Sequence, residues 1–405
     1  MRAFLATVRS LGKAGLEIDV APFDWKSPAL HSRYISNIHY LPHPSQDPRR
    51  WAEETAEIVK RRGYDLIVPM CERSLLPLVK YEDLFEPGQI AHPGRQALAA
   101  FIDKAETKSL ALACNVPVAP GRLLRTSDNA DNLIDEFDLP IVIKNTASYR
   151  IESLDYRSKV SIARKPEQLS AALADLDPAE PHLVEGYFPP SGKGQGVGVS
   201  VLASKGTVLI AFQHARLLEP AGGGGSSIRI SEQLDPQLLE ACRSLAQRTV
   251  LNGVAMFEFR RDRVTGEAIL VEVNPRFWGS LPLAIFAGVD FPCMLYEMLV
   301  KGKQPKQPDY RIGCQAQNLV NSVYDHLFRS EGRRWKGIWS SFTDIGMAAL
   351  KGVGLGPRNL CFDSFDRKDF APGFREITAL PRVLVGRINQ RKQKLPESRN
   401  VTPQS

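Results

Sequence analysis

Hydrophobic positions alternate between helical and strand-like spacing from the start of the chain. Apolar residues within 1–14 recur at intervals of three and four, which predicts an amphipathic helix, and the apolar segment 16–21 then predicts a strand. A second helix is predicted over 51–63 and a second strand over 65–70. Helices that alternate with short apolar strands are typical of a parallel sheet covered on both faces, so we expect the chain to begin with an α/β domain.

The middle of the chain continues this alternation. A helix is predicted over 103–116, a strand over 139–144, a helix over 165–176 and a strand over 181–187. These four elements predict a compact unit of their own.

The second half changes to paired strands. Segments 196–203 and 207–218 flank a turn and predict one antiparallel hairpin, and segments 254–260 and 267–273 flank a turn near Thr265 and predict another.

The second hairpin carries acids on one face. The strand period of two separates Glu258 from its neighbours Phe257 and Phe259, and it places Glu272 and Asn274 on a common face. A turn centred near residue 265 brings Glu258 opposite Glu272 or within a residue or two of it, and like charges directly opposite each other destabilise a ladder. Two carboxylates and an amide oxygen are a ligand set that magnesium uses together with substrate phosphates, so the pattern predicts a magnesium-phosphate site.

Arg276 has the same parity as Asn274 in the segment "VEVNPR", and its planar fork suits a phosphate or carboxylate oxygen. A charged face of an exposed hairpin is the alternative interpretation of this cluster.

With these residues the sequence resembles the ATP-grasp enzymes, in particular the short relatives of the carbamoyl-phosphate synthetase large chain and of biotin carboxylase. The resemblance is carried by "FEF" followed by "VEVNPR", and by "DKAETKSLA", "PIVIK", "LVEGY" and "AFQHARLLE" in the family's order. It implies an α/β ATP-grasp fold and ATP with Mg²⁺, or Mn²⁺ in its place, as cofactors.

The resemblance also implies roles for individual residues. Glu258, Glu272 and Asn274 inherit the metal role, and Arg276 contacts phosphate and acyl oxygens. The nucleotide is expected to contact two lysines that bind its phosphates and a hinge beside its adenine. The transferred phosphate is expected to face two basic residues of one strand. These residues are Lys104 and Lys144, then Glu185, Gly186 and Tyr187, and finally His214 and Arg216.

Three departures from the family pattern stand out. The strand that normally precedes the first helix is not in this sequence, so either the chain begins short or the sheet lacks that edge. The loop after Lys144 lacks the usual glycines. Gly196 stands where the family often has an acid for the ribose hydroxyls. The glycine-rich segment 221–227 is expected to cradle the acceptor's carboxylate or phosphate through its amides, or else to be a surface loop.

Four parts follow from the resemblance and from the composition. They are a Rossmann-like pre-ATP-grasp domain over 1–100, a small lobe over 101–185, a large lobe with the metal site over 186–305, and a basic helical extension over 306–405. The last stretch, 387–405, is polar and is expected to be disordered.

The basic charge of the chain resides in its last quarter. The formal net charge is +7, and residues 301–405 hold 19 Lys and Arg against 9 Asp and Glu. Within that region, 333–351 places six apolar residues on one helical stripe: Trp335, Ile338, Trp339, Phe342, Ile345 and Ala349. This pattern fits contact with an anionic membrane or polymer, or docking of the stripe on the protein's own body.

The six cysteines are scattered without a C-x-x-C pair, which argues against a disulfide framework and favours a reducing, cytoplasmic compartment. No apolar run reaches the length of a membrane span.

The leading hypothesis is an ATP-dependent carboxylate-amine ligase that forms an acyl phosphate. Its partners would be a small carboxylate and an amine, with no nucleic acid expected and a homodimer left open. The alternatives are a nucleotide-binding scaffold or regulator without turnover, and a carboxylase or carbamoyl-phosphate-type enzyme that uses bicarbonate.

Overall fold

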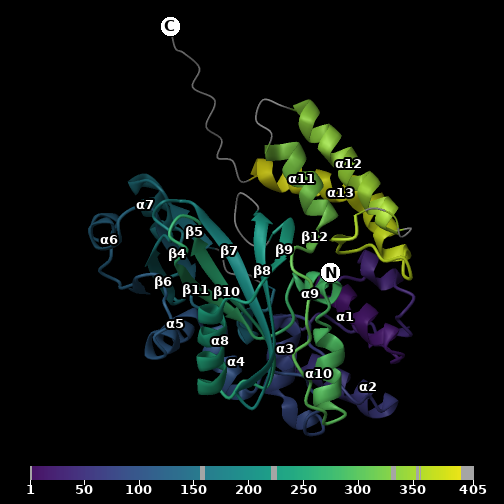
Figure 1. Ribbon diagram of the computed structural model, residues 1–405. Helices are drawn as coiled ribbons and strands as arrows, with labels where there is room; N and C mark the ends of the chain where they lie inside the picture. The colour runs from purple at the N-terminus through teal and green to yellow at the C-terminus, as the bar shows by residue number, and fades with distance from the viewer. Residues whose placement is uncertain are drawn as a thin grey trace.

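A computed structural model describes residues 2–155, 160–219, 226–329, 334–352, 355 and 357–393 of the chain. Figure 1 shows a central sheet with a small lobe on one side, while helices from both ends of the chain lie on the other side. The described residues combine helices with parallel and antiparallel strands, as the sequence predicts.

Seven strands form the central sheet in the order β11-β10-β7-β8-β9-β12-β13. They are β7 (Gly194–Ser204), β8 (Thr207–Leu218), β9 (Ile228–Glu232), β10 (Gly253–Asp262), β11 (Ala268–Asn274), β12 (Gln315–Gln317) and β13 (Leu360–Phe362). Neighbouring strands are antiparallel except β12 and β13, which are parallel. Both predicted hairpins, β7–β8 and β10–β11, are therefore confirmed.

Hydrophobic side chains cover both faces of this sheet because strand residues alternate between faces. Phe257 and Phe259 lie in one core, which includes helix α8 (Pro236–Arg248). Met256, Phe212 and Trp278 belong to a second core. That core is completed by α9 (Leu281–Ala287) and α10 (Phe291–Leu299).

The small lobe is a four-stranded antiparallel sheet in the order β3-β6-β4-β5. Its elements are α5 (Lys104–Ala113), β3 (Gly121–Leu123), α6 (Ala130–Phe137), β4 (Ile141–Asn145), η3 (Ile151–Ser153), β5 (Val160–Ala163), α7 (Pro166–Ala174) and β6 (His182–Gly186). The helices and strands predicted between 103 and 187 are all present. A core of its own, with Leu133, Ile143 and Leu169, joins α6 and α7 to the sheet.

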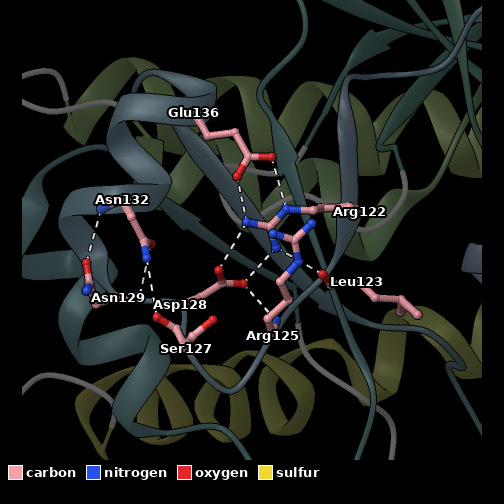
Figure 2. Close-up of polar contacts among 8 residues, drawn as sticks. All are labelled: Arg122, Leu123, Arg125, Ser127, Asp128, Asn129, Asn132 and Glu136. Atoms are coloured by element: carbon pink, nitrogen blue, oxygen red, sulfur yellow. Dashed lines mark hydrogen bonds and ion pairs between the residues drawn. The ribbon is translucent and has the colours of Figure 1, made fainter.

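A charged cluster secures the connection between β3 and α6, as Figure 2 shows. Arg122 donates to both oxygens of Asp128 at 2.7 and 3.0 Å and to Glu136 at 2.5 and 3.0 Å. Asp128 also accepts from the backbone amide of Arg125, and its hydrogen bonds to Arg122 lower the pKa of Asp128. Asn129 caps α6 through the amide of Asn132. These contacts hold the edge of the small lobe without involving the central sheet.

The first domain contains less sheet than the sequence predicts. Strands β1 (Asp19–Val20) and β2 (Asn37–Ile38) form a two-stranded parallel sheet, and the segment predicted as a strand over 65–70 makes one isolated bridge, between Ile67 and Ile90. Proline provides no amide proton for a ladder, and Pro69 interrupts the 65–70 segment. The parallel sheet expected here is therefore reduced to short pairings in the described residues.

Helices make up most of this domain. They are α1 (Arg2–Lys13), η1 (Pro28–His31), α2 (Pro48–Arg62), α3 (Glu72–Lys80), η2 (Glu82–Leu84) and α4 (Arg95–Ile102). The two predicted helices are present, and α2 ends at Gly63, whose φ of 69° is the left-handed conformation that glycine adopts readily.

The C-terminal extension is more than the helical appendage that the sequence predicts. Strands β12 and β13 continue the central sheet beyond β9, while α11 (Leu319–Arg329), α12 (Arg334–Gly352) and α13 (Ala371–Gln393) stand beside it (Figure 1). Arg9 of α1 donates to the Asp369 carboxylate at 2.8 Å and to the Asp369 carbonyl at 2.7 Å. The first helix and the extension are therefore held together directly.

The predicted apolar helix over 333–351 forms as α12. Ala348 is fully buried, and Ile345 and Met347 pack against a core that includes Leu319 and Phe362. This supports docking of α12 on the protein's own body. The side chains of the other predicted stripe residues lie outside the described part of the chain: Trp335, Ile338, Trp339, Phe342 and Ala349.

The polar C-terminal stretch was expected to be disordered from residue 387, but α13 continues to Gln393, so that expectation is wrong for 387–393. Residues 394–405 lie outside the described range. Over the described part of the chain, no single helix has the length and apolar composition of a membrane span, and one pair bent by 90°, α9 with α10, passes that test together.

Candidate active site

The paired acids of the β10–β11 hairpin lie directly opposite each other. Glu258 is the register partner of Glu272, and Met256 that of Asn274, which confirms the pairing predicted from the sequence. Phe257 and Phe259 point into the core on the other face. The hairpin therefore presents two carboxylates and an amide on one face of the central sheet.

Hydrogen bonds draw these three side chains together. The amide nitrogen of Asn274 donates to Glu272 at 3.1 Å and to Glu258 at 3.4 Å. Burial and the neighbouring Glu272 raise the pKa of Glu258, while Arg216 opposes that rise. Two mutually repelling acids held by one amide are an arrangement that a divalent cation would stabilise.

Arg216 reaches the acids from the next hairpin. Its side chain, on β8, pairs with Glu258 at 2.5 Å, and Glu258 is the largest cause of a raised pKa for Arg216. Directly across the ladder from Arg216 lies another cation, Arg229 of β9, which pairs with Asp363 of the extension.

Two glycines of β7 make room for these side chains. A Cβ atom on Gly196 would lie 2.7 Å from the Cδ of Arg216, and one on Gly198 would lie 2.3 Å from the ring of His214. Gly198 stands between Glu258 on one neighbouring strand and His214 on the other. At these two positions β7 therefore has no side chain, which leaves room for Arg216 and His214 of β8 to extend across β7 towards the acids.

His214 is fully enclosed in this arrangement. It is 2% exposed, and burial followed by the charges of Arg216 and Arg229 lowers its pKa to about 3. Its ring is stacked with Phe212 at a centroid distance of 6.4 Å, and its Nδ1 atom has no hydrogen-bond partner among the described residues. At neutral pH the histidine is uncharged, so it can meet a phosphate only as a hydrogen-bond donor.

Arg276 links the acids to the first domain. It donates to the Asn274 side-chain oxygen at 3.0 Å, to the carbonyl of Phe277 at 2.8 Å and to the carboxylate of Glu72 at 2.7 Å. Its side chain is 19% exposed and that of Glu72 is 14% exposed. Glu72 opens helix α3, so a residue about two hundred positions away in the chain enters the site.

The predicted phosphate lysines lie in the small lobe. Lys104 begins α5 and donates to Ser148 at 2.9 Å, and burial lowers its pKa while Glu272 opposes that change. Lys144 lies on β4 and pairs with Glu185 at 2.6 Å. Glu272 acts on Lys104 by its charge, which connects the small-lobe lysine electrostatically to the acids of the central sheet.

Glu185 has a side-chain role that the sequence did not predict. Its carboxylate pairs with Lys108 at 2.8 Å as well as with Lys144, and all three side chains are about nine-tenths buried. The two lysines outweigh the burial of Glu185, whose pKa is lowered. This buried triad carries one net positive charge.

Two amides of the predicted adenine hinge already donate hydrogen bonds within the protein. The amide of Gly186 donates to the carbonyl of Pro120, and the amide of Tyr187 donates to the carbonyl of Pro140, each at 3.0 Å. The backbone groups that these two residues can offer a nucleotide are therefore their carbonyl oxygens.

Glu219 lies beside Gly196, the position where the family often carries an acid. It accepts from the amide of Gly196 at 2.9 Å and pairs with Arg260 at 2.7 Å. Glu219 therefore places a carboxylate next to Gly196, although it is not at the position where the family often carries its acid. Residues 220–225 of the predicted cradle lie outside the described range, whereas Ser226 and Ser227 are described and buried.

The residues fit a divalent cation that also binds phosphates. Protein side chains alone do not complete such a site, since the described residues contain no group of three or more His, Cys, Asp and Glu that could hold a metal ion. Magnesium commonly takes one or two carboxylates and fills its remaining positions with water and phosphate oxygens. Glu258 and Glu272 with Asn274 supply that partial set.

Sequence reasoning missed Glu72, Lys108, Gly198 and Glu219. Glu72 follows the apolar segment 65–70 after one intervening residue, as functional acids often follow strand ends, and this was the available signal. The other three carry no local pattern that distinguishes them from surface or turn residues.

Comparisons with known proteins agree with these motifs. The model of a family described as "ATP-grasp in the biosynthetic pathway with Ter operon" matches residues 187–321. The D-alanine–D-alanine ligase A of Bradyrhizobium diazoefficiens is 27% identical over 236 residues, which are 52% of this chain and 60% of that protein. The chain therefore aligns with about three fifths of the length of this curated relative.

Two solved structures have similar folds. The biotin carboxylase domain dimer of the Hydrogenobacter thermophilus 2-oxoglutarate carboxylase, in complex with MgADP, ADP and bicarbonate, matches with a TM-score of 0.59 and 18% identity, covering 77% of this chain and 71% of that one. The N5-carboxyaminoimidazole synthetase of Staphylococcus aureus matches with a TM-score of 0.61 and 15% identity, covering 82% and 84%.

Proposed function

We propose that this chain, which has the ATP-grasp fold that its motifs predict, is an ATP-dependent ligase that activates a carboxylate as an acyl phosphate and joins it to an amine. ATP and Mg²⁺ are its cofactors. The observation that carries the proposal is the direct pairing of Glu258 with Glu272, with Asn274 and Arg276 beside them. The similarity to a D-alanine–D-alanine ligase supports an amine as the second substrate.

The chemical difficulty of such a reaction is charge. An anionic carboxylate must approach an anionic γ-phosphate in line, so catalysis consists mainly of positioning and charge neutralisation. Magnesium, when bound by Glu258, Glu272 and Asn274 together with the phosphates, supplies Lewis-acid neutralisation of the transferred group.

Cationic side chains would supply the rest of the positioning and charge neutralisation. Lys104 and Lys144 would bind the nucleotide phosphates from the small lobe, and a phosphate would compete with Glu185, the present partner of Lys144. Arg216 and Arg276 flank the acids on either side, where they would hold oxygens of the transferred phosphate and of the acyl group. His214 is neutral and adds a hydrogen bond without charge.

Substitution of the paired acids tests this proposal. Release of ADP is measured with purified protein, Mg-ATP and a panel of amino acids, peptides and sugar acids, to find the carboxylate that stimulates it. Glu272→Gln should abolish the stimulated release while the thermal unfolding temperature stays close to that of the wild type, because the change removes a metal ligand without removing volume.

Glu267→Gln is a matched control, because Glu267 is an exposed residue beside the turn of the same hairpin. It should retain full activity. Normal turnover by Glu272→Gln, or an ADP release that no carboxylate stimulates, would contradict the ligase assignment; the second result would favour a nucleotide-binding scaffold.

A second reaction is supported by the fold alone. The chain resembles a biotin carboxylase domain whose crystal contains bicarbonate, so bicarbonate belongs in the same panel as a candidate carboxylate. Stimulation of ADP release by bicarbonate alone would favour a carboxylase or carbamoyl-phosphate-type reaction over amide formation.

The setting of the enzyme is part of the proposal. All six cysteines are unpaired, which supports a reducing compartment such as the cytoplasm. The dimeric state of the Hydrogenobacter domain supports a test for a homodimer by light scattering. The extension packs on the protein's own body, so the proposal does not include contact with a membrane or polymer.

A further inference from the structure

Arg2 is the first residue of α1 and reaches two segments that border the candidate site. Its Nη1 atom donates to the carbonyl of Ser226 at 3.3 Å, and Ser226 lies in the connection between β8 and β9. Its Nη2 atom lies 3.3 Å from the position that a Cβ atom on Gly279 would take, three residues after Arg276. A cation from the first domain therefore lies beside the expected acceptor cradle and beside the segment that carries Arg276.

Two further arginines lie near Arg2. Arg229 of β9 pairs with Asp363, and the Nη1 atom of Arg2 lies 3.8 Å from the same carboxylate. Arg229 is also directly opposite Arg216 of β8. Burial lowers the pKa of Arg2, an effect that Asp363 opposes, and the charges of the two other arginines lower it further. Three guanidinium groups therefore gather at this end of the β8 and β9 strands.

The acids beside Arg2 and Arg229 do not balance their charge. Asp363 is shared by the two arginines, and the Nε and Nη1 atoms of Arg229 are buried without a partner among the described residues. Glu376 of α13 also faces Arg2, but burial raises the pKa of Glu376 to about 7, so it is ionised only in part at neutral pH. Because a buried cation without an anion is costly, this cluster favours an anionic ligand.

Arg2 is the member of the cluster that a substrate can reach. Its side chain is 23% exposed, whereas that of Arg229 is 1% exposed. Arg216 pairs with Glu258 of the predicted metal set, so the cluster adjoins the place where the reacting carboxylate is expected to meet the transferred phosphate. An anion on Arg2 would therefore lie on the carboxylate substrate's side of the reaction.

We propose that Arg2 binds a second anionic group of the carboxylate substrate, so that the acid which the enzyme activates is doubly anionic. The inference rests on the proposed ligase function and adds the class of its first substrate. That class is an acid whose non-reacting end is a carboxylate or a phosphate, because the planar fork of arginine donates two parallel hydrogen bonds to either group.

A structural role for Arg2 would give a different result. If Arg2 served only to join α1 to the extension, its loss would affect every acid alike, whereas a binding residue affects only acids that carry the second anion. Hydroxylamine isolates the first substrate because it replaces the amine. Its nitrogen attacks the acyl carbon of the acyl phosphate, loses a proton and releases inorganic phosphate, and the hydroxamate is measured by its colour with iron(III).

The experiment compares wild type, Arg2→Gln, Arg2→Lys and a control, Arg49→Gln. Arg49 lies in α2 of the same domain, and its side chain is 72% exposed and pairs with Glu53. The acids are the dicarboxylates from malonate to adipate, each with its monoamide, and 3-phosphoglycerate with glycerate, added to the panel described above. Hydroxamate formation gives KM and kcat for each acid, and calorimetry gives the Kd of each acid in the presence of Mg-ADP.

We expect wild type to prefer the doubly anionic member of a pair, and the pair that shows the preference identifies the second group as a carboxylate or a phosphate. Arg2→Gln should raise the KM and Kd of that acid about 10- to 100-fold, as for a lost hydrogen bond to a charged group. Its kcat, its affinity for Mg-ADP and its KM for singly anionic acids should stay unchanged. Arg2→Lys should recover part of the affinity, and Arg49→Gln should behave as wild type.

Three results would overturn the inference. They are a wild type that uses singly anionic acids at least as well as doubly anionic ones, an Arg2→Gln protein that keeps the wild-type preference, and an equal loss for both members of each pair in that variant. A wild type that forms hydroxamate from no acid of the panel would instead overturn the ligase proposal, and this inference with it.

Discussion

Arg229 and Asp363 form an ion pair in which each side chain is only 1% exposed. Arg229 lies on β9 directly opposite Arg216, and Asp363 follows β13 in the C-terminal extension. Two arginines opposite each other on neighbouring strands would repel, so the extension supplies the anion that makes this pairing stable. The extension is therefore part of the structure that supports the candidate site.

Removal of that anion should destabilise the protein strongly. Asp363→Asn leaves the guanidinium of Arg229 buried without a counter-charge, and its Nε and Nη1 atoms already have no partner among the described residues. Breaking a buried pair from one side costs about 3–5 kcal/mol of unfolding free energy. Urea denaturation followed by circular dichroism measures the change.

Asp366→Asn is the matched control for this substitution. Asp366 lies three residues after Asp363 in the same segment. It pairs with Lys13, whose side chain is 40% exposed. An exposed pair contributes about 0–1 kcal/mol, so the control should lose little stability. Equal losses in the two variants would show that burial of the Arg229–Asp363 pair does not set its contribution.

Gly198 should tolerate no larger residue. The Cβ atom of Gly198→Ala would lie within 2.3–3.0 Å of three ring atoms of His214, which is itself enclosed and cannot move aside easily. Overpacking of this kind costs about 1–3 kcal/mol. Displacement of His214 should also weaken the binding of Mg-ADP, and calorimetry together with thermal unfolding measures both effects.

Gly346→Ala tests the same change where there is space. Gly346 lies in α12, and a Cβ there would meet no atom of the described residues within 4 Å. Alanine is favoured over glycine in a helix by about 1 kcal/mol, so this variant should be as stable as wild type or more stable. A Gly198→Ala protein with unchanged stability would contradict the packing argument.

The central hairpin could be predicted from the sequence because its geometry is local. A turn near Thr265 and the strand period of two decide which residues face each other, and both are visible in a short segment. The sequence therefore predicts that Glu258 lies opposite Glu272 or within a residue or two of it, and the register of the two strands places them directly opposite each other.

Contacts between distant segments could not be predicted in this way. Glu72 and Arg276 are separated by 204 positions, and Lys108 and Glu185 by 77. Their proximity results from the order of strands in two sheets and from the docking of the first domain on the central one. Neither pattern nor composition near these residues contains that information.

Two regions differ from the prediction because sheet pairing depends on more than apolar character. The segment 65–70 has the composition of a strand but makes one bridge, since Pro69 lacks the amide that a ladder needs. Conversely, β12 and β13 are three residues long and give no periodic signal, yet they extend the central sheet because β9 offers an edge to β12 and β12 offers one to β13.

His214 should make the protein less stable in acid. Its pKa in the folded protein is about 3, below the ordinary value of 6.5, so the unfolded chain binds the proton more readily. The free energy of unfolding contributed by this residue is fully present above pH 6.5 and falls as the pH decreases towards 3, by up to about 1.4 kcal/mol per pH unit.

Denaturation of wild type and His214→Gln at a series of pH values measures this contribution. The difference in unfolding free energy between the two proteins should shrink steadily as the pH falls below 6.5. A difference that does not change with pH over this range would show that the pKa of His214 is the same in the folded protein and in the unfolded chain.

Lys108 should support nucleotide binding although it is not one of the predicted phosphate lysines. Lys108 and Lys144 share the carboxylate of Glu185, which would compete with a phosphate for Lys144. With Lys108→Met, Glu185 depends on Lys144 alone and holds it more strongly. The Kd for Mg-ADP should therefore rise about tenfold, which calorimetry can measure.

Lys165→Met provides the control for this last substitution, because Lys165 is an exposed residue at the start of α7 in the same lobe. It removes the same charge from the small lobe without touching Glu185, so its Kd for Mg-ADP should match that of wild type. Equal weakening by both substitutions would mean that the lobe's net charge matters, and that competition for Glu185 does not control Lys144.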